Sequence, residues 1–470
     1  MRAANRAGTT TPAEPVVAIR EVHSPFDNSR VGAVPECGEA DVESACRAAA
    51  DALREGGFGQ DRRAEVLHTA ALAVRARREE MAVLLMREAG KPIRDARSEV
   101  DRCVATLRHS AAVALTMSGE MVPTSSPADG LALALRVPAG VVAAITPFNF
   151  PLNLVAHKVG PAIAAGCPVV LKPSEDAPLS ALALVDVLYE AGLPPGWITP
   201  VTGTGEAVGA PLVAHPVPRV VSFTGSVSAG RSIAARASDK RVLLELGSNA
   251  PVIVHGDGDV ARAATDIARA GFSYAGQSCI STQRVFVDHA VYREFVELLR
   301  RSVDALVVGD PADERTDVGP MIRPAERDRV VSWVDEAVRG GGTVAAGGGV
   351  TDGLLQPTVV LDPPMDCALM TKEAFGPVVG VVPYAGFDEA LRMANATDFG
   401  LQAGVYTTST SLALRAAAEL DFGGVLINRT PTFRMDQQPY GGRKDAGNTR
   451  EGPAYAALEM TDLKFVLLND

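Results

Sequence analysis

The sequence is short of paired cysteines and of long apolar runs. Its six cysteines are widely spaced over 470 residues without a CxxC pair, and its seven histidines include no HExxH motif. Neither a disulfide framework nor a metal site is therefore predicted. No apolar run approaches the roughly 20 residues that a membrane span needs, and residues 1–15 lack the apolar region of a secretory signal. We expect a cytoplasmic protein that does not bind membranes.

Positive charge is scarce as well. The formal net charge is −11 and the isoelectric point is near 5.3, which argues against nucleic-acid binding through a basic surface. With 47% hydrophobic and 21% charged residues, the composition is typical of a globular protein. The length allows roughly two to four domains.

Apolar periodicity divides the chain into regions. The first hundred residues are predicted to be helical, with helices near 42–55 and 62–88, and a further helix covers 97–115. Alternation from Leu131 to Val137 predicts a strand, one arm of an extended hairpin. From residue 140 to about 430, strands and helices alternate, which predicts a doubly wound α/β fold with ligands at the carboxyl ends of parallel strands.

Cys279 lies in the stretch FSYAGQSCIST, among small and polar residues. Structural cysteines are usually surrounded by Leu, Val and Ile, and the other five cysteines of the chain fit that description as small apolar residues. The stretch alone leaves open whether the thiol packs, binds a ligand or acts as a nucleophile.

Two further polar residues follow predicted strands. Glu245 in LELGSNAP ends an apolar strand, where partial burial would raise its pKa and suit a general base; a capping or ion-paired glutamate fits equally well. Asn149 in TPFNFPLN could donate to an oxyanion at a strand-to-helix junction, although asparagine is also common in plain turns. The turn at Gly225 and Ser226 in SFTGSVSAG opens a helix whose N–H groups could hold a pyrophosphate.

Taken together, these motifs resemble the aldehyde dehydrogenase superfamily. TPFNFP, LKPSE, FTGS, LELGSNAP, AGQSC and KEAFGPV occur in the family's order, over essentially the whole chain. The 34 residues between Glu245 and Cys279 also match. The resemblance implies an aldehyde dehydrogenase fold, made of a Rossmann-like NAD domain (1–117 and 138–246), an α/β catalytic domain (247–453) and a β-hairpin oligomerisation arm (118–137 and 454–470). A homodimer or homotetramer is expected, because the arm has an exposed edge.

The same resemblance assigns the catalytic roles. Cys279 corresponds to the nucleophile that adds to the aldehyde as a thiolate. Asn149 and the Cys279 N–H would hold the oxyanion, and loss of hydride to the nicotinamide would leave a thioester. Glu245 would activate the water that hydrolyses it, so a carboxylic acid is the expected product rather than a coenzyme A ester.

Cofactor contacts follow by the same matching. Lys172 and Glu175 resemble the pair that binds the adenosine ribose, and a carboxylate at Glu175 would repel a 2′-phosphate, which favours NAD over NADP. One departure is Phe148, where many members carry Trp. The cofactor contacts implied by the resemblance are Thr146, Lys172, Glu175, Phe223, Gly225, Ser226, Leu246, Glu373 and Phe375.

The tail PTFRMDQQPYGGRKDAGNTREG resembles the branch that acts on lactaldehyde, phosphonoacetaldehyde and glyceraldehyde 3-phosphate. It implies a small polar aldehyde, with a phosphonate or carboxylate held by arginine, or a neutral hydroxyaldehyde such as lactaldehyde. Ser278 departs from members that carry Arg before the nucleophile, so an anion would be held differently here. The substrate contacts implied are Arg108, His157, Ser278, Ile280 and Arg434. A non-catalytic binding protein and a cofactor-independent esterase are the alternative functions.

Overall fold

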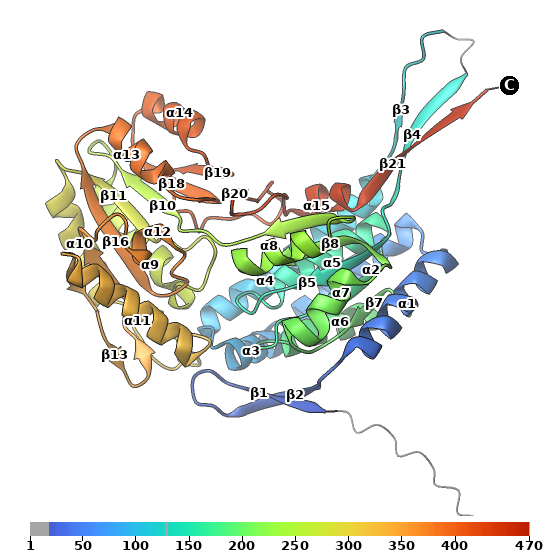
Figure 1. The fold of residues 1–470 in the computed structure, drawn as a ribbon, viewed down its shortest axis with the longest axis horizontal. Helices are drawn as coiled ribbons and strands as arrows, with labels where there is room; N and C mark the ends of the chain where they lie inside the picture. The colour runs from blue at the N-terminus through green and yellow to red at the C-terminus, as the bar shows by residue number, and fades with distance from the viewer. Residues whose placement is uncertain (1–17, 127–129, 470) are drawn as a thin grey trace, which may run out of the picture.

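The computed structural model describes residues 18–126 and 130–469. They form two α/β lobes and a protruding antiparallel arm (Figure 1). The N-terminal stretch examined for a secretory signal and the tip of the predicted hairpin, 127–129, lie outside the described residues. Within the described residues, no helix is both long and apolar enough to cross a membrane.

The first lobe is built on a parallel sheet with strand order β7-β6-β5-β8-β9. Its central strand β5 is apolar along its whole length because both faces of the sheet are covered. Val142 and Ala144 of β5 enter one core, whereas Val141 and Ala143 enter the core on the opposite face. The strands are β5 (Val141–Ile145), β6 (Val169–Lys172), β7 (Ile198–Pro200), β8 (Pro218–Thr224) and β9 (Arg241–Glu245).

Helices cover both faces of this sheet. The long helix α4 packs against α2 and α5 on one face. A left-handed glycine, Gly166, ends α5 as its sequence predicts. The helices of this lobe are α1 (Glu39–Glu55), α2 (Gln60–Ala76), α3 (Arg78–Ala89), α4 (Ile93–Thr116), α5 (Asn153–Ala165), α6 (Leu179–Glu190), α7 (Ala210–Ala214) and α8 (Val227–Arg236).

Two expectations for the first hundred residues are wrong. A hairpin of β1 (Ile19–His23) and β2 (Arg30–Pro35) precedes α1, so this region is not all helical. The expected helix at 62–88 is two helices, because the backbone leaves the helical region at Arg77 (φ −99°, ψ 22°). The periodicity continues across that residue because both helices bury one face in the same core.

The second lobe holds a seven-stranded sheet with order β12-β15-β16-β11-β10-β18-β19, parallel except for the β12–β15 pair. Its strands are β10 (Pro251–Val254), β11 (Arg284–Asp288), β12 (Thr343–Ala346), β15 (Thr358–Leu361), β16 (Val378–Tyr384), β18 (Gln402–Tyr406) and β19 (Gly424–Ile427). Two short strand pairs lie outside this sheet: β13 (Val350–Thr351) with β14 (Leu354–Leu355), and β17 (Phe399–Gly400) with β20 (Arg443–Lys444). Its helices are α9 (Val260–Phe272), α10 (Tyr292–Asp304), α11 (Pro324–Arg339), α12 (Ala368–Thr371), α13 (Phe387–Asn395) and α14 (Thr410–Glu419).

The arm joins three antiparallel strands, β3 (Glu120–Met121), β4 (Leu131–Pro138) and β21 (Thr461–Leu468). Leu463, Phe465 and Leu467 of β21 are about half exposed or more. Preceding β21, α15 (Pro453–Glu459) packs against α5 of the first lobe, although its sequence falls mostly within the expected arm segment. β9 ends the first sheet at Glu245 and β10 begins the second at Pro251, on either side of the expected domain boundary.

Candidate active site

Cys279 follows α9 on a loop whose backbone is unusual. Three consecutive residues, Tyr274, Ala275 and Gly276, have φ between 49° and 68°, a region that costs side-chain-bearing residues about 1–3 kcal/mol and is common at functional sites. Tertiary contacts hold the loop in place: the Tyr274 hydroxyl donates to the Ala89 carbonyl at 2.8 Å, and the Gln277 side chain accepts from the Ile322 N–H at 2.8 Å. The loop is therefore fixed to both lobes.

The Cys279 sulfur faces an internal cavity and has one polar neighbour among the described residues. Its Sγ lies 2.9 Å from the Tyr440 hydroxyl. Burial raises the pKa of the thiol to about 12, against the lowering effects of Tyr440 and of the nearby Arg434 charge.

Asn149 reaches the same loop from the junction between β5 and α5. Its Nδ2 donates to the Gln277 carbonyl at 3.0 Å, two residues before the cysteine. The Cys279 N–H has no hydrogen-bond partner among the described residues. Asn149 is therefore tied to the loop that carries Cys279.

Glu245 ends β9 as a buried residue without a polar partner. Neither carboxyl oxygen has a hydrogen-bond partner in the described part of the chain. Burial, helped by the negative charge of Glu451, raises its pKa well above the usual value. Backbone packs closely on it: a Cβ added to Gly441 would lie 2.8 Å from its Oε1. When it is ionised, a carboxylate whose pKa is raised in this way is a stronger base than an exposed one.

Lys172 and Glu175 lie at the carboxyl end of β6. Glu175 accepts ion pairs from Arg20 at 3.1 Å and from Arg323 at 3.4 Å. Burial alone would raise its pKa, but the Arg20 hydrogen bond and the Arg323 charge lower it. Lys172 donates to the Pro173 carbonyl at 3.1 Å. Glu175 is thus ionised and shared between two arginines from outside its own strand.

The turn after β8 leads directly into α8. A Cβ on Gly225 would meet the Phe223 ring at 2.5 Å, so glycine is needed there. Ser226 caps α8 by accepting from the Ala229 N–H at 3.3 Å, and the helix presents its first N–H groups beside this turn. Leu246, which follows β9, is buried in the adjoining core.

Glu373 and Phe375 approach from the second lobe. Glu373 accepts from the Ser248 N–H at 2.9 Å, and burial raises its pKa to about 7. The rings of Phe375 and Phe148 meet edge to face, with centroids 5.8 Å apart. The hydroxyl of Thr146 is buried without a partner among the described residues. Three features of this region fit a bound dinucleotide: the unpartnered hydroxyl of Thr146, the glycine turn at the start of α8, and the ionised carboxylate of Glu175, which would accept from a ribose hydroxyl.

A cavity of about 390 Å³ opens in front of Cys279 between α4, the start of α5 and the C-terminal tail. Of the five predicted substrate contacts, Ser278, Ile280 and Arg434 line it. Arg108 does not: it is exposed on α4, and the helix instead turns Arg102 into the cavity, six residues earlier and about 120° around the axis. The structure thus places Arg108 outside this cavity, unlike the expected position.

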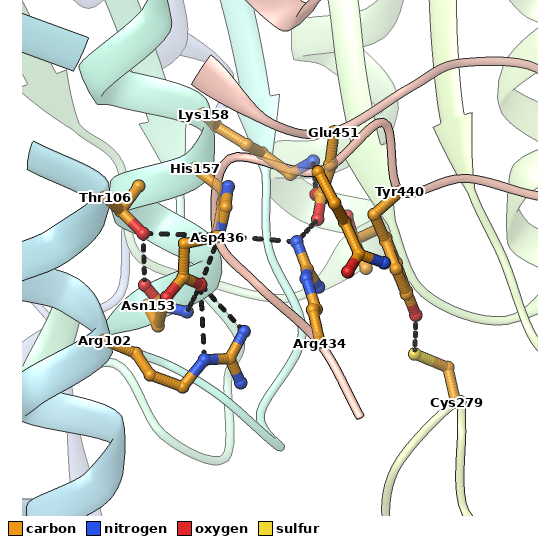
Figure 2. Close-up of polar contacts among 12 residues, drawn as sticks. Arg102, Thr106, Asn153, His157, Lys158, Cys279, Arg434, Asp436, Tyr440 and Glu451 are labelled. Carbon is orange, nitrogen blue, oxygen red and sulfur yellow. Dashed lines mark hydrogen bonds and ion pairs between the residues drawn. The ribbon is translucent and has the colours of Figure 1, made fainter. Parts of the chain in front are cut away.

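His157 is buried behind the cavity wall rather than lining it. Its Nε2 lies 3.1 Å from Oδ1 of Asp436, which also accepts from Arg102 at 2.9 Å and from Asn153 at 3.2 Å (Figure 2). Burial and the charge of Arg434 lower the pKa of His157. His157 thus acts on the cavity only through its neighbours, which corrects its expected role as a direct contact.

Arg434 points into the cavity with its charge already paired. Its Nη2 donates to Glu451 at 2.8 Å, and its guanidinium lies 3.8 Å from the centre of the Tyr440 ring. Its Nε has no partner among the described residues, although the side chain is only 6% exposed. Figure 2 shows Arg434 between His157, Glu451 and Tyr440.

Sequence reasoning missed several residues of this site. Tyr440, Asp436 and Glu451 lie in the tail stretch that points to small polar aldehydes, and that stretch was the only available signal. Arg102 and Arg269 also line the cavity, but nothing in the helical pattern separates them from surface arginines. Among the described residues, no group of three His, Cys, Asp or Glu side chains is arranged to hold a metal ion.

The chain was compared with known proteins. The model of the aldehyde dehydrogenase family matches residues 14–466. The 3-sulfolactaldehyde dehydrogenase of Priestia aryabhattai is 44% identical over 432 residues, 91% of this chain and 90% of that protein. A lactaldehyde dehydrogenase of Methanococcus maripaludis is 40% identical over 388 residues, 82% of each chain. The solved glyceraldehyde-3-phosphate dehydrogenase GapN of Methanocaldococcus jannaschii, complexed with NADP, superimposes with a TM-score of 0.93 at 35% identity, covering 96% of this chain and 99% of that one.

Proposed function

The chain belongs to the aldehyde dehydrogenase family, as its motifs predicted, and is an NAD(P)-dependent enzyme that oxidises aldehydes to acids; we propose that Cys279 is its nucleophile and that its substrate is a small anionic aldehyde. The observation that supports this most is Arg434, a buried arginine that lines the same cavity as Cys279.

The chemistry follows from the chain's own groups. The Cys279 thiolate adds to the aldehyde carbon, and the carbonyl oxygen becomes an oxyanion that the Asn149 amide and the Cys279 N–H can hold. NAD(P), when bound, accepts the hydride that leaves this carbon. Glu245 then takes a proton from water as the water attacks the resulting thioester, so the acid is released and the thiolate returns. Lys172, Glu175, the turn at Gly225 and Glu373 would hold the cofactor.

An anionic substrate is supported by the cations of the cavity. Arg434 and Arg102 both line it, and Arg269 at its lining has no ion-pair partner among the described residues. Arginine suits sulfonate, phosphonate and carboxylate groups because its planar fork donates two parallel hydrogen bonds. Two of the relatives act, by their names, on aldehydes that carry a sulfonate or a phosphate. We therefore take 3-sulfolactaldehyde as the first candidate.

A neutral hydroxyaldehyde is the second candidate, and a specific observation favours it. Arg434 is paired with Glu451 and Arg102 with Asp436, so both charges are already compensated before substrate binds. A relative named lactaldehyde dehydrogenase fits this alternative.

For the cofactor we propose a preference for NAD. The ionised Glu175 would repel a 2′-phosphate, but Arg20 and Arg323 offset its charge. The preference should therefore be moderate rather than strict.

The exposed apolar face of β21 supports a proposed homodimer or homotetramer. Leu463 and Phe465 are 57% and 61% exposed, and burying such an edge against a second copy removes both apolar surface and unpaired strand groups from water. Size-exclusion chromatography with light scattering would measure the mass, and a monomer would contradict this proposal.

NADH formation across an aldehyde panel tests the substrate. We would pair 3-sulfolactaldehyde, phosphonoacetaldehyde and succinic semialdehyde with lactaldehyde and propanal, using wild type, Arg102→Gln and Arg108→Gln. The anionic aldehydes should have higher kcat/KM, and Arg102→Gln should remove about tenfold or more of that advantage, since a charge-assisted hydrogen bond is lost. Arg108→Gln, on the same helix but outside the cavity, is the matched control. Faster turnover of neutral aldehydes, unaffected by Arg102→Gln, would favour the lactaldehyde-like substrate.

A further inference from the structure

The hydroxyl of Tyr440 contacts the sulfur of Cys279, the proposed nucleophile. The hydroxyl oxygen lies 2.9 Å from Sγ of Cys279, and neither atom has another polar partner among the described residues. The tyrosine is 3% exposed, and its backbone is fixed by a two-way bridge to Glu451, with N···O distances of 3.0 and 2.6 Å. The bridge fixes the backbone of Tyr440, and burial surrounds its ring, so the tyrosine is held beside the sulfur.

The direction of this hydrogen bond depends on the state of the cysteine. A neutral thiol can donate or accept, whereas a thiolate can only accept. Once the S–H bond breaks and its proton leaves to water in the cavity, the Tyr440 hydroxyl becomes a donor to an anion while keeping its own proton. Hydrogen bonds to charged groups are roughly twice as strong as neutral ones, so this contact favours the thiolate.

Arg434 holds the other side of the same tyrosine. Its guanidinium carbon lies 3.8 Å from the ring centre, and Glu451 fixes it at 2.8 Å (Figure 2). A cation over a phenol ring draws electron density from the ring and makes the hydroxyl a better donor. The positive charge also acts on the sulfur directly, in the direction that lowers the thiol pKa.

We propose that Tyr440 is a further catalytic residue, which donates a hydrogen bond to the Cys279 thiolate, and that Arg434 is a positioning residue that holds and polarises Tyr440. This inference rests on the proposed role of Cys279 as the nucleophile. It gives Arg434 two tasks, so an Arg434 variant alone cannot separate substrate binding from thiol activation.

The rate of Cys279 alkylation tests the inference without substrate or cofactor. Iodoacetamide would be added to the full chain at a series of pH values, and modification would be read on the Cys279 peptide by mass spectrometry, since five other cysteines are present. Tyr440→Phe removes the hydroxyl and keeps the ring beneath Arg434. Tyr292→Phe is the control: its hydroxyl donates to Asp362 at 3.2 Å in the second lobe, away from the residues that line this cavity.

Loss of a charge-assisted hydrogen bond should raise the thiol pKa by about one to two units. Because a more basic thiolate is also more nucleophilic, the rate near neutral pH should fall by about three- to tenfold rather than more. Tyr292→Phe should stay within about twofold of wild type. A Tyr440→Phe rate equal to or above that of wild type, or an equal fall in Tyr292→Phe, would overturn the proposal.

Arg434→Met provides a second, independent variant. It should also slow alkylation, and an unchanged rate would remove Arg434 from the inference. Cys279→Ala separates this inference from the proposed function. If that variant still oxidises aldehydes, the nucleophile is wrong and both fail, whereas an inactive Cys279→Ala beside an unaffected Tyr440→Phe overturns only the role of Tyr440.

Discussion

Two buried glutamates near the active site come from different regions and have opposite ionisation. Glu245 ends the last strand of the first sheet, and Glu451 lies in the loop before α15. They are 3% and 4% exposed, so burial is the same for both. The pKa of Glu245 is nevertheless raised well above its usual value, whereas that of Glu451 is lowered to about 2.

The difference comes from the partners. Burial raises the pKa of both carboxyls, but Glu451 lies 2.8 Å from Arg434 and 3.6 Å from Lys158, and these charges outweigh burial. Glu245 has no such partner among the described residues. Equal burial thus yields one group that can exchange a proton during catalysis and one fixed anion that organises the cations around it.

The largest effect should come from Glu245→Gln. Without the base, hydrolysis of the thioester should slow by about 10²- to 10⁴-fold. The free energy of unfolding should not fall, because neither carboxyl oxygen has a hydrogen-bond partner among the described residues to lose. The mass of the enzyme after incubation with aldehyde and NAD would reveal an acyl adduct. Full turnover without an adduct would contradict the assigned role.

Glu451→Gln should have the opposite consequence. It leaves Arg434 and Lys158 buried without a counter-ion and should lower the free energy of unfolding by about 3–5 kcal/mol. Urea denaturation would measure this, with exposed Glu206→Gln as a control that should stay within about 0.5 kcal/mol of wild type. A Glu451→Gln protein as stable as wild type would mean that the ion pairs contribute little.

The pH dependence of stability should distinguish the two glutamates. Above pH 4.5, Glu245 loses its proton in the unfolded state but keeps it in the folded state. The wild type therefore loses stability as pH rises towards the folded pKa. Relative to wild type, the free energy of unfolding of Glu245→Gln should rise by up to about 1.4 kcal/mol per pH unit over this range. The stability that Glu451 supplies is present above pH 4.5 and lost as pH falls towards 2, so the deficit of Glu451→Gln should shrink there. Parallel stability curves for wild type and both variants would refute the comparison.

A third glutamate, Glu175, is ion-paired like Glu451 but is not deeply buried. Glu175 pairs with Arg20 and Arg323, but its side chain is 34% exposed. Glu175→Ser should therefore change the free energy of unfolding by less than about 1 kcal/mol, yet narrow the ratio of NAD to NADP affinity. Equilibrium titration with each cofactor would measure that ratio, and an unchanged value would count against its contact with the ribose.

Much of this molecule follows from the sequence alone. The apolar strands from residue 141 onward and their alternation with helices identify the parallel sheets, because a strand buried on both faces must be apolar throughout. The family and its fold, identified from the order of the motifs, are confirmed. Cys279, Asn149 and Glu245 could be proposed in advance because they stand at the family's motif positions, whereas their local neighbours alone left their roles open.

Other features depended on the tertiary structure. Which arginine of α4 enters the cavity, Arg102 or Arg108, depends on how the helix is rotated against α5, and both positions look alike in the sequence. The sequence likewise carries no strong local signal for the break at Arg77 or for the hairpin before α1.

The ionisation of the buried groups depends on contacts that form only in the folded protein. Glu451 is an anion because Arg434 and, from almost three hundred residues earlier, Lys158 lie beside it. Tyr440 meets Cys279 across 161 residues of chain. The sequence determined which groups the chain carries and which backbone each local segment prefers. The tertiary structure decided which charges meet, because electrostatic and hydrogen-bond energies depend on distances in space that local sequence patterns do not encode.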